Sequence, residues 1–210
     1  VDVIQGGANF VVKNFTGWNL QCVTNPACQF VQAVGSVLGG STLTVKDSSL
    51  IFDMPTTTTR IFTEVGSLSG TEISGSTVTF SAITVTFTGG NAPVDKIFYS
   101  DTAVNTGGSL IITQFNVNSN YFSKCAFGIY LIGNMLSTGT VTISQNSIKC
   151  NPTATSGDFS LLNLGGTSGT NTMTGSSSFV VDLNTFTSSG RSFRFHLIHM
   201  SYDLQGTSSV

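Results

Sequence analysis

Charged side chains are scarce in this sequence of 210 residues, which contains 8 Lys and Arg, 10 Asp and Glu, and 9% charged residues in all. A formal net charge of −2 leaves no basic surface that could neutralise a run of phosphates, so nucleic acid is not an expected partner. The hydrophobic content of 40% is high enough to bury a core. We therefore expect a folded chain rather than a disordered one.

Long apolar runs and metal-ligand patterns are also lacking. The longest apolar run, from Ile129 to Leu136, contains Gly133 and Asn134, and it is far shorter than the ~20 residues that cross a bilayer. The sequence has no CxxC pair, no Cys/His spacing typical of zinc and no Asp-rich set that suits Ca²⁺. We expect no membrane span in this segment, no metal and no cofactor.

Ser and Thr take the place of the missing charge, with 58 residues between them beside 23 Gly. This composition is typical of short strands that are joined by many tight turns. The sequence therefore predicts an all-β fold, and its length fits one domain over residues 1–210.

An eight-residue pattern, which we call the octet, returns along the chain with large apolar residues at its first, third and eighth positions. Positions one and three lie on the same face of a strand, so both are expected to point inward. The sixth position is Asn in the last three copies, and Asn suits a bend because it tolerates left-handed backbone angles. The copies are Leu43–Leu50, Val78–Val85, Phe115–Phe122, Val141–Ile148 and Phe179–Phe186. Residues 10–17 resemble a degraded sixth copy.

The starts of these copies are 35, 37, 26 and 38 residues apart, which is too far for simple hairpins but fits the coils of a solenoid. A second strand-like run falls within each interval, so each coil is expected to carry at least two strands. These runs are Arg60–Thr63, Lys96–Tyr99, Gly128–Leu131, Phe159–Leu162 and Phe193–Leu197.

The runs Val117–Phe122, Ile143–Ile148 and Val181–Phe186 follow the pattern V-x-x-N-x-F. This pattern resembles the right-handed parallel β-helix superfamily, the pectin-lyase-like group. The resemblance implies asparagines stacked inside a turn and aliphatic residues stacked inside the coil. The charge-poor, Ser/Thr/Gly-rich style is also similar to the repetitive β-helical ectodomains of large surface proteins, including those of kinetoplastid parasites.

The predicted fold is therefore a right-handed parallel β-helix of about five to six coils, with an antiparallel β-sandwich as the alternative. Within it, residues 1–40 are expected to be irregular or capping, with a helical turn at Val31–Val34. The coils are expected over 41–200 and a tail over 201–210. The first residue, Val1, and the linker-like end Gln205–Val210 favour a fragment of a longer chain or assembly.

Few residues are candidates for a binding site. Arg194 and His196 are predicted to point outward from one strand and, with Arg191, could contact an anionic sugar or a partner carboxylate. The alternative is an ordinary solvated strand face. Trp18 could stack on a sugar ring or pack over the end of the coil.

Two features favour a location outside the cell. The sequence Asn14-Phe15-Thr16 fits the N-glycosylation pattern, and the four cysteines are even in number. The favoured disulfides are Cys22–Cys28 and Cys125–Cys150, one of three connectivities; free buried thiols in a reducing compartment are the alternative.

Glycoside hydrolysis, one of the reactions of enzymes on this fold, needs two nearby carboxylates, but the acids within the octets, Asp47 and Asp182, are separated by three intervening copies. Phe186 also stands where such hydrolases carry an acid after Asn-Thr. We therefore expect a non-catalytic extracellular or cell-surface structural or adhesive module. Its partners would be glycans, another cell-surface protein or its own copies stacked end to end. A polysaccharide lyase or hydrolase, or a carbohydrate-binding module, is the alternative.

Overall fold

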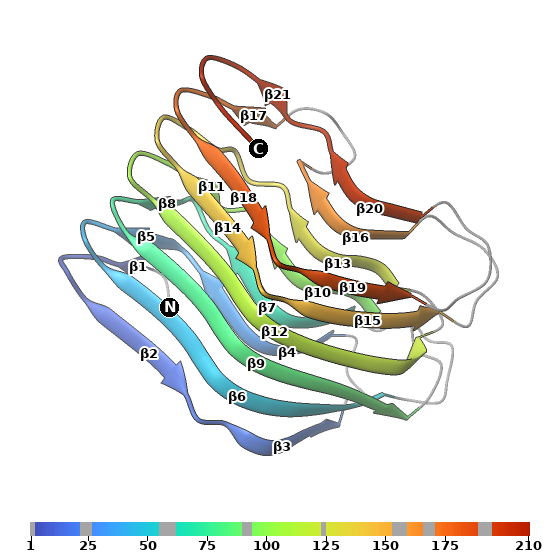
Figure 1. The fold of residues 1–210 in the computed structure, drawn as a ribbon. Helices are drawn as coiled ribbons and strands as arrows, with labels where there is room; N and C mark the ends of the chain where they lie inside the picture. Colours follow the sequence, from blue (N-terminus) through green and yellow to red (C-terminus); the bar gives the residue numbers. More distant parts are fainter. Residues whose placement is uncertain are drawn as a thin grey trace.

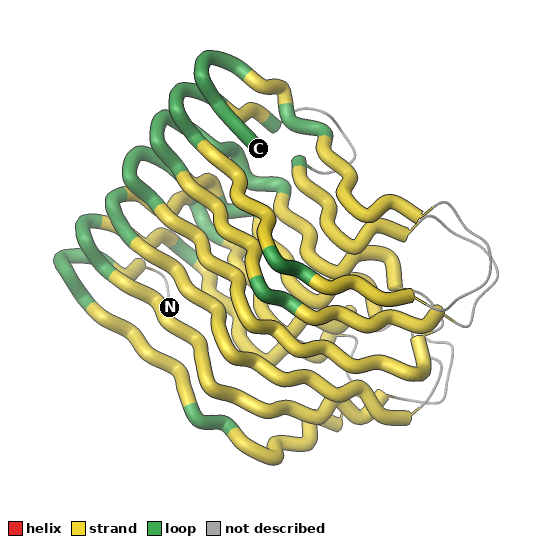
Figure 2. The backbone as a smooth tube through the Cα atoms, viewed as in Figure 1, coloured by secondary structure: helices red, strands yellow, loops and turns green. Residues whose placement is uncertain are grey.

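The computed structural model describes residues 3–21, 27–54, 62–89, 94–122, 125–152, 159–165, 171–188 and 195–210. These residues form strands and turns, with no helix among them (Figure 2). Every strand pairing in the described ranges is parallel, and the strands stack coil upon coil into a β-solenoid (Figure 1). The predicted all-β parallel β-helix is confirmed, and the antiparallel sandwich is wrong.

The largest side of the solenoid, which we call the octet sheet, follows the order β18-β14-β12-β9-β6-β2, with β3, β15 and β19 alongside. Its long strands are bent, and in some coils the bend divides one strand into two. The strands are β2 (Asn9–Lys13), β3 (Thr16–Gln21), β6 (Thr42–Met54), β9 (Thr77–Gly89), β12 (Ser109–Phe122), β14 (Thr140–Ser144), β15 (Ser147–Pro152), β18 (Ser178–Asp182) and β19 (Thr185–Ser188).

The second sheet has the order β20-β16-β13-β10-β7-β4 and faces the octet sheet across the core. Its strands are β4 (Ala27–Val34), β7 (Phe62–Ser69), β10 (Val94–Ser100), β13 (Cys125–Leu131), β16 (Phe159–Leu164) and β20 (Phe195–Met200). The predicted runs Lys96–Tyr99, Gly128–Leu131 and Phe159–Leu162 lie within β10, β13 and β16. The expectation of a second strand in each of these coils is therefore confirmed.

A third side consists of short corner strands that place one apolar residue per coil into the core. The corner strands are β1 (Val3–Ile4), β5 (Ser36–Leu38), β8 (Glu72–Ser74), β11 (Ala103–Val104), β17 (Thr172–Met173) and β21 (Asp203–Leu204). Their pairings and two isolated bridges align the column Ile4, Val37, Ile73, Val104, Met135, Met173 and Leu204.

The octets stack through the molecule as columns of like residues. The first octet position forms the column Phe10, Leu43, Val78, Leu110, Val141 and Phe179. The third position forms the column Val12, Val45, Phe80, Ile112, Ile143 and Val181. Between the end coils these side chains are buried, because alternation along the strand turns both positions inward.

The third octet begins at Leu110, five residues before the predicted start at Phe115. The strand pairing aligns Leu110–Val117 with the other copies, so Ile112 and not Val117 lies between Phe80 and Ile143. Val117 instead belongs to the column of the eighth position, beside Val85 and Ile148. The cause is the length of β12, whose 14 residues fit the pattern in two windows.

The residues expected to form an irregular cap are part of the stack. Residues 3–38 contain β1 to β5, and residues 10–17 are a true octet that pairs with β6. The expected helical turn at Val31–Val34 is wrong, because these residues pair with β7 as the end of β4. A neighbouring strand satisfies their backbone groups more completely than a single isolated turn could.

Candidate functional site

The bend in the octet sheet is built by the same backbone conformation in every coil. The fifth octet residue has a positive φ throughout: Asn14 63°, Asp47 51°, Ala82 51°, Gln114 56°, Gln145 55° and Leu183 52°. Left-handed geometry at residues other than glycine is uncommon and carries strain. Its recurrence shows that stacking fixes the bend. The prediction that the Asn at position six adopts it is wrong by one residue.

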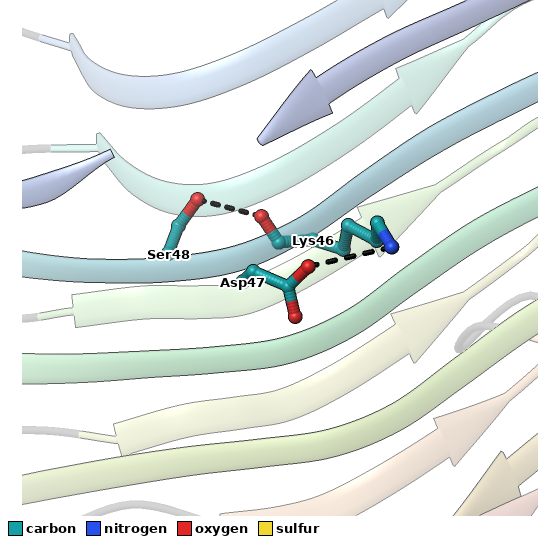
Figure 3. Close-up of polar contacts among 3 residues, drawn as sticks. All are labelled: Lys46, Asp47 and Ser48. Atoms are coloured by element: carbon teal, nitrogen blue, oxygen red, sulfur yellow. Dashed lines mark hydrogen bonds and ion pairs between the residues drawn. The ribbon is translucent and has the colours of Figure 1, made fainter. Parts of the chain in front are cut away.

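Figure 3 shows this bend in the second coil. The hydroxyl of Ser48 donates to the carbonyl oxygen of Lys46 at 3.0 Å, and the ammonium group of Lys46 lies 3.4 Å from a carboxylate oxygen of Asp47. Both charged side chains are roughly half exposed, so the ion pair contributes at most ~1 kcal/mol. Asp47 is thus engaged by its own neighbour.

The sixth octet position carries an asparagine ladder in the last two octets. Asn146, which is buried, donates from Nδ2 to Oδ1 of Asn184 at 2.9 Å and to the carbonyl of Ile112 at 3.1 Å. Its Oδ1 accepts from the backbone N–H of Phe115 at 2.9 Å. Asn184 in turn donates to the carbonyl of Ile143 at 2.7 Å. Stacked asparagines inside the bend are therefore confirmed for this pair, while Phe115 holds the position in the preceding coil.

The two octet carboxylates lie far apart. Asp47 follows the first half of β6 and Asp182 ends β18, with β9, β12 and β14 between these strands. At ~4.8 Å per strand the separation along the stack is about 19 Å, which is too long for a catalytic pair. The described residues also contain no group of three or more His, Cys, Asp or Glu that could hold a metal ion.

The predicted binding residues are not brought into one described site. Trp18 lies in β3 at the first coil, is 54% exposed, and sets its ring edge-on to Phe15 at 5.1 Å. The backbone of His196 pairs with Ser160 in the second sheet. The side chain of His196, and all of Arg191 and Arg194, lie outside the described residues.

The predicted modification sites are described only in part. Asn14 is exposed at the first bend, and its backbone N–H donates to the carbonyl of Asp47 at 3.1 Å. Cys22 lies outside the described residues. The backbones of Cys28, Cys125 and Cys150 lie in β4, β13 and β15, but their side chains are not described. Glycosylation at Asn14 and both disulfides stay predictions.

An aromatic stack lies on the second sheet. The rings of Tyr99 and Tyr130 are stacked with centroids 5.9 Å apart, and the ammonium group of Lys96 lies 4.0 Å from the Tyr99 centroid. The Tyr99 hydroxyl donates to Asp101 at 3.3 Å. Cross-strand aromatic pairs and cations over rings stabilise a sheet. Because Lys96 lies over the Tyr99 ring, we interpret this cluster as a contact that stabilises the second sheet.

The apolar surface of the described residues concentrates at the two ends of the stack. At the first coil Phe10, although at an inward position, is 43% exposed, and it lines an apolar hollow with Ile4 and Leu43. At the last coil Leu204, also at an inward position, is 52% exposed. Leu162, which precedes Ile198 in its column, is buried, whereas Ile198 is exposed. Both ends therefore combine open strand edges with uncovered core residues, which is the signature of an interaction surface.

Comparison with models of protein families, with curated proteins and with solved structures finds no match for this chain. Within the ranges that the structure describes, no helix has the length and apolar character to cross a membrane. Inference about function therefore starts from the stack and its two ends.

The residues that distinguish these two ends are not among the predicted site residues. Lys13 begins and Asp182 ends the column of the fourth octet position, and Val11 and Val180 do the same for the second position. The signal was present in the octets themselves. It lies in the second and fourth positions of residues 10–17 and Phe179–Phe186.

Proposed function

We propose that this chain is a non-catalytic structural or adhesive β-helix module that works outside the cell or at its surface, as part of a larger protein or filament. The observation that carries the proposal is the unbroken set of inward columns, from Ile4 to Leu204 at the corner and from Phe10 to Phe179 in the octet sheet. Each coil is stabilised chiefly by its neighbours, so the stack acts as a spacer of fixed length.

The outer face of the octet sheet supports an adhesive role. The outward octet positions carry mainly hydroxyl and amide side chains, such as Thr44, Thr79, Thr142 and Asn116, on a continuous parallel sheet. Such a face offers many hydrogen-bonding groups and little charge. Its contacts would be polar and only weakly sensitive to salt.

The proposed location follows from Asn14 and the cysteines. Asn14 is exposed and begins the sequence Asn-Phe-Thr, so an attached glycan would have room at the edge of the first coil. Relationship to the pectin-lyase-like superfamily, or to repetitive surface proteins of the kinetoplastid kind, is part of the proposal. The ladder of Asn146 and Asn184 supports the first of these.

A second candidate, a carbohydrate-binding module, is favoured by one observation. Trp18 lies in β3 of the first coil and exposes more than half of its surface, so its ring is accessible to a ligand. Exposed aromatic rings are common at sugar sites because they can cover one face of a sugar ring.

A glycan screen separates these functions. The purified chain is incubated with uronate-containing and neutral polysaccharides, and both binding and release of reducing or unsaturated ends are measured. We expect no product release. Release that is lost in Arg194→Ala or His196→Ala would overturn the non-catalytic proposal. Binding without release that is lost in Trp18→Ala but kept in Trp18→Phe would establish the carbohydrate-binding module.

A further inference from the structure

We propose that the domain assembles head to tail with a second copy of itself, so that β2 and β4 of one copy continue the two main sheets beyond β18 and β20 of the other. This inference rests on the proposed structural function and names its partner. The junction would use the same register that joins successive coils within one chain. Lys13 would then lie beside Asp182, Val11 beside Val180, and Val31 beside Ile198.

Charge complementarity between the two ends is the first argument. The fourth octet position forms the outward column Lys13, Lys46, Ser81, Thr113, Ser144 and Asp182. Within one chain Lys13 has Lys46 as its cross-strand neighbour, which is unfavourable for like charges. Asp182 at the other end is paired with Ser144. Stacking two copies would bring the opposite charges together.

The second octet position also makes the two ends complementary, here through apolar side chains. Its outward column runs Val11, Thr44, Thr79, Ile111, Thr142 and Val180. The two terminal residues are valines, 41% and 44% exposed, where three of the four inner residues are threonines. In the proposed junction these valines cover each other, which removes apolar surface from water on an outward face.

The core side of the second sheet is also complementary. Val31 and Ala33 of β4 begin the columns that end with Ile198 and Met200 of β20. Val31 is partly buried against the core, and Ile198 is 45% exposed. Joining these ends continues two apolar columns and pairs open strand edges with each other.

Segment 203–210 occupies part of the strand edge to which residues 3–10 of the second copy would bind. It reads D-L-Q-G-T-S-S-V, and residues 3–10 read V-I-Q-G-G-A-N-F, with Gly206 and Gly6 at φ 76° and 70°. The segment is held by a ladder of backbone hydrogen bonds, including Gln205 N–H to Met173, Thr207 N–H to Gly175 and Ser209 N–H to Ser177.

Residues 3–10 of a second copy could replace this ladder nearly bond for bond. The exchange of hydrogen bonds therefore contributes little net free energy. The driving force comes from β2, β3 and β4, which cover strands that segment 203–210 leaves open. Segment 203–210 thus acts as a competing strand that limits assembly.

Sedimentation velocity over a wide concentration range tests the charge pair. Lys13→Asp and Asp182→Lys should each raise the dissociation constant of self-association by about 5-fold, as expected for a partly exposed pair turned repulsive. The chain that carries both changes should return to within about 2-fold of the unchanged protein. Loss without recovery, or no effect of either change, would overturn the proposed register.

Deletion of residues 203–210 tests the competing strand. We expect the shortened chain to associate at least about 10-fold more tightly, and Lys13→Asp to weaken that association as well. Unchanged or weaker association would overturn the competition, and so would tighter association that is indifferent to Lys13→Asp. If the shortened chain does not fold by circular dichroism, Leu204→Ser in the full chain loosens the same segment and should tighten association.

The two proposals fail in different ways. A chain that stays monomeric at every concentration and shows no turnover on glycans overturns the head-to-tail junction alone. Turnover of a glycan overturns the non-catalytic function, whatever the state of assembly.

Discussion

The middle coils and the end coils carry the same residue pattern but have different surroundings. Phe80 in β9 is fully buried between β6 and β12, whereas Phe10 in β2 is 43% exposed and, among the described strands, has a neighbour on one side only. At the corner, Met173 is buried and Leu204 is half exposed, although both belong to one column.

The comparison shows that burial in this fold is decided by the number of neighbouring coils and not by the residue itself. Stability should therefore concentrate in the middle coils, and the capacity to bind another molecule should concentrate at the ends. The first two predictions below test that division with pairs of substitutions, one farther inside the stack and one nearer an end.

The largest difference is expected between two phenylalanines. Phe80→Ala should lower the free energy of unfolding by ~3–5 kcal/mol, because a buried ring is lost between Phe98 at 4.9 Å and the coils above and below. Phe10→Ala should cost ~1 kcal/mol, since much of that ring is already in water. Urea denaturation followed by circular dichroism measures both values. Equal costs would mean that the end coil is as tightly packed as the middle.

The asparagine ladder offers the next pair. Asn146→Ala removes the acceptor for the Phe115 N–H and the donor to the Ile112 carbonyl, and it should cost ~2–3 kcal/mol because these groups stay buried and unpaired. Asn184→Ala lies nearer the open end, is only partly buried, and should cost ~1–2 kcal/mol. Thermal unfolding of both variants checks the order, and a larger cost for Asn184→Ala would contradict it.

Much of this architecture could be predicted from the sequence because stacking forces like residues into the same position. The apolar first and third positions and the Asn146–Asn184 pair were found in this way. The bend at position five was missed because its residues, among them Ala82 and Leu183, share a backbone angle and no side-chain type. Neighbouring coils impose that angle, and no local preference announces it.

The corner strands were missed for a different reason. Each contributes only two or three residues, so no alternation can develop. A usable signal exists, since an apolar residue such as Ile4 or Val37 lies six positions before the first octet residue, Phe10 or Leu43. Lys13 and Asp182 occupy the fourth position of the first and last octets, and the order in which the coils stack identifies these octets as the ends.

The dependence of stability on pH tests how tightly the side chain of Tyr202 is packed near the last coil. Its side chain packs against Phe179, and its hydroxyl donates to the carbonyl of Gly133; burial raises the pKa of Tyr202 above its ordinary value. The unfolded chain releases this proton near pH ~10 while the folded chain retains it, so stability should be constant below that pH and fall as the pH rises further. Denaturation midpoints from pH 8 to 11 measure the slope.

Tyr202→Phe is the control for this titration. It should cost ~1 kcal/mol at neutral pH through the lost hydrogen bond, and it should flatten the decline above pH ~10. A slope that persists in Tyr202→Phe would assign it to other groups. In that case the hydroxyl group of Tyr202 would be more accessible to solvent than the structure indicates.

The smallest expected effect has opposite signs for stability and for assembly. Lys13→Ser removes the like-charge neighbour of Lys46 and should stabilise the isolated domain by ~0.2–0.5 kcal/mol at low salt, while it weakens self-association because Asp182 of the other copy loses its partner. Lys149→Ser in β15 is the matched control, since Asn118 and Thr187 flank Lys149 in the sheet, and it should change neither quantity. Denaturation at 20 and 500 mM NaCl, combined with sedimentation, separates the two effects. If Lys13→Ser raises stability but leaves association unchanged, Lys13 is destabilising and has no role in assembly. If it raises stability and weakens association, Lys13 lowers the stability of the end coil and strengthens its binding to a second copy.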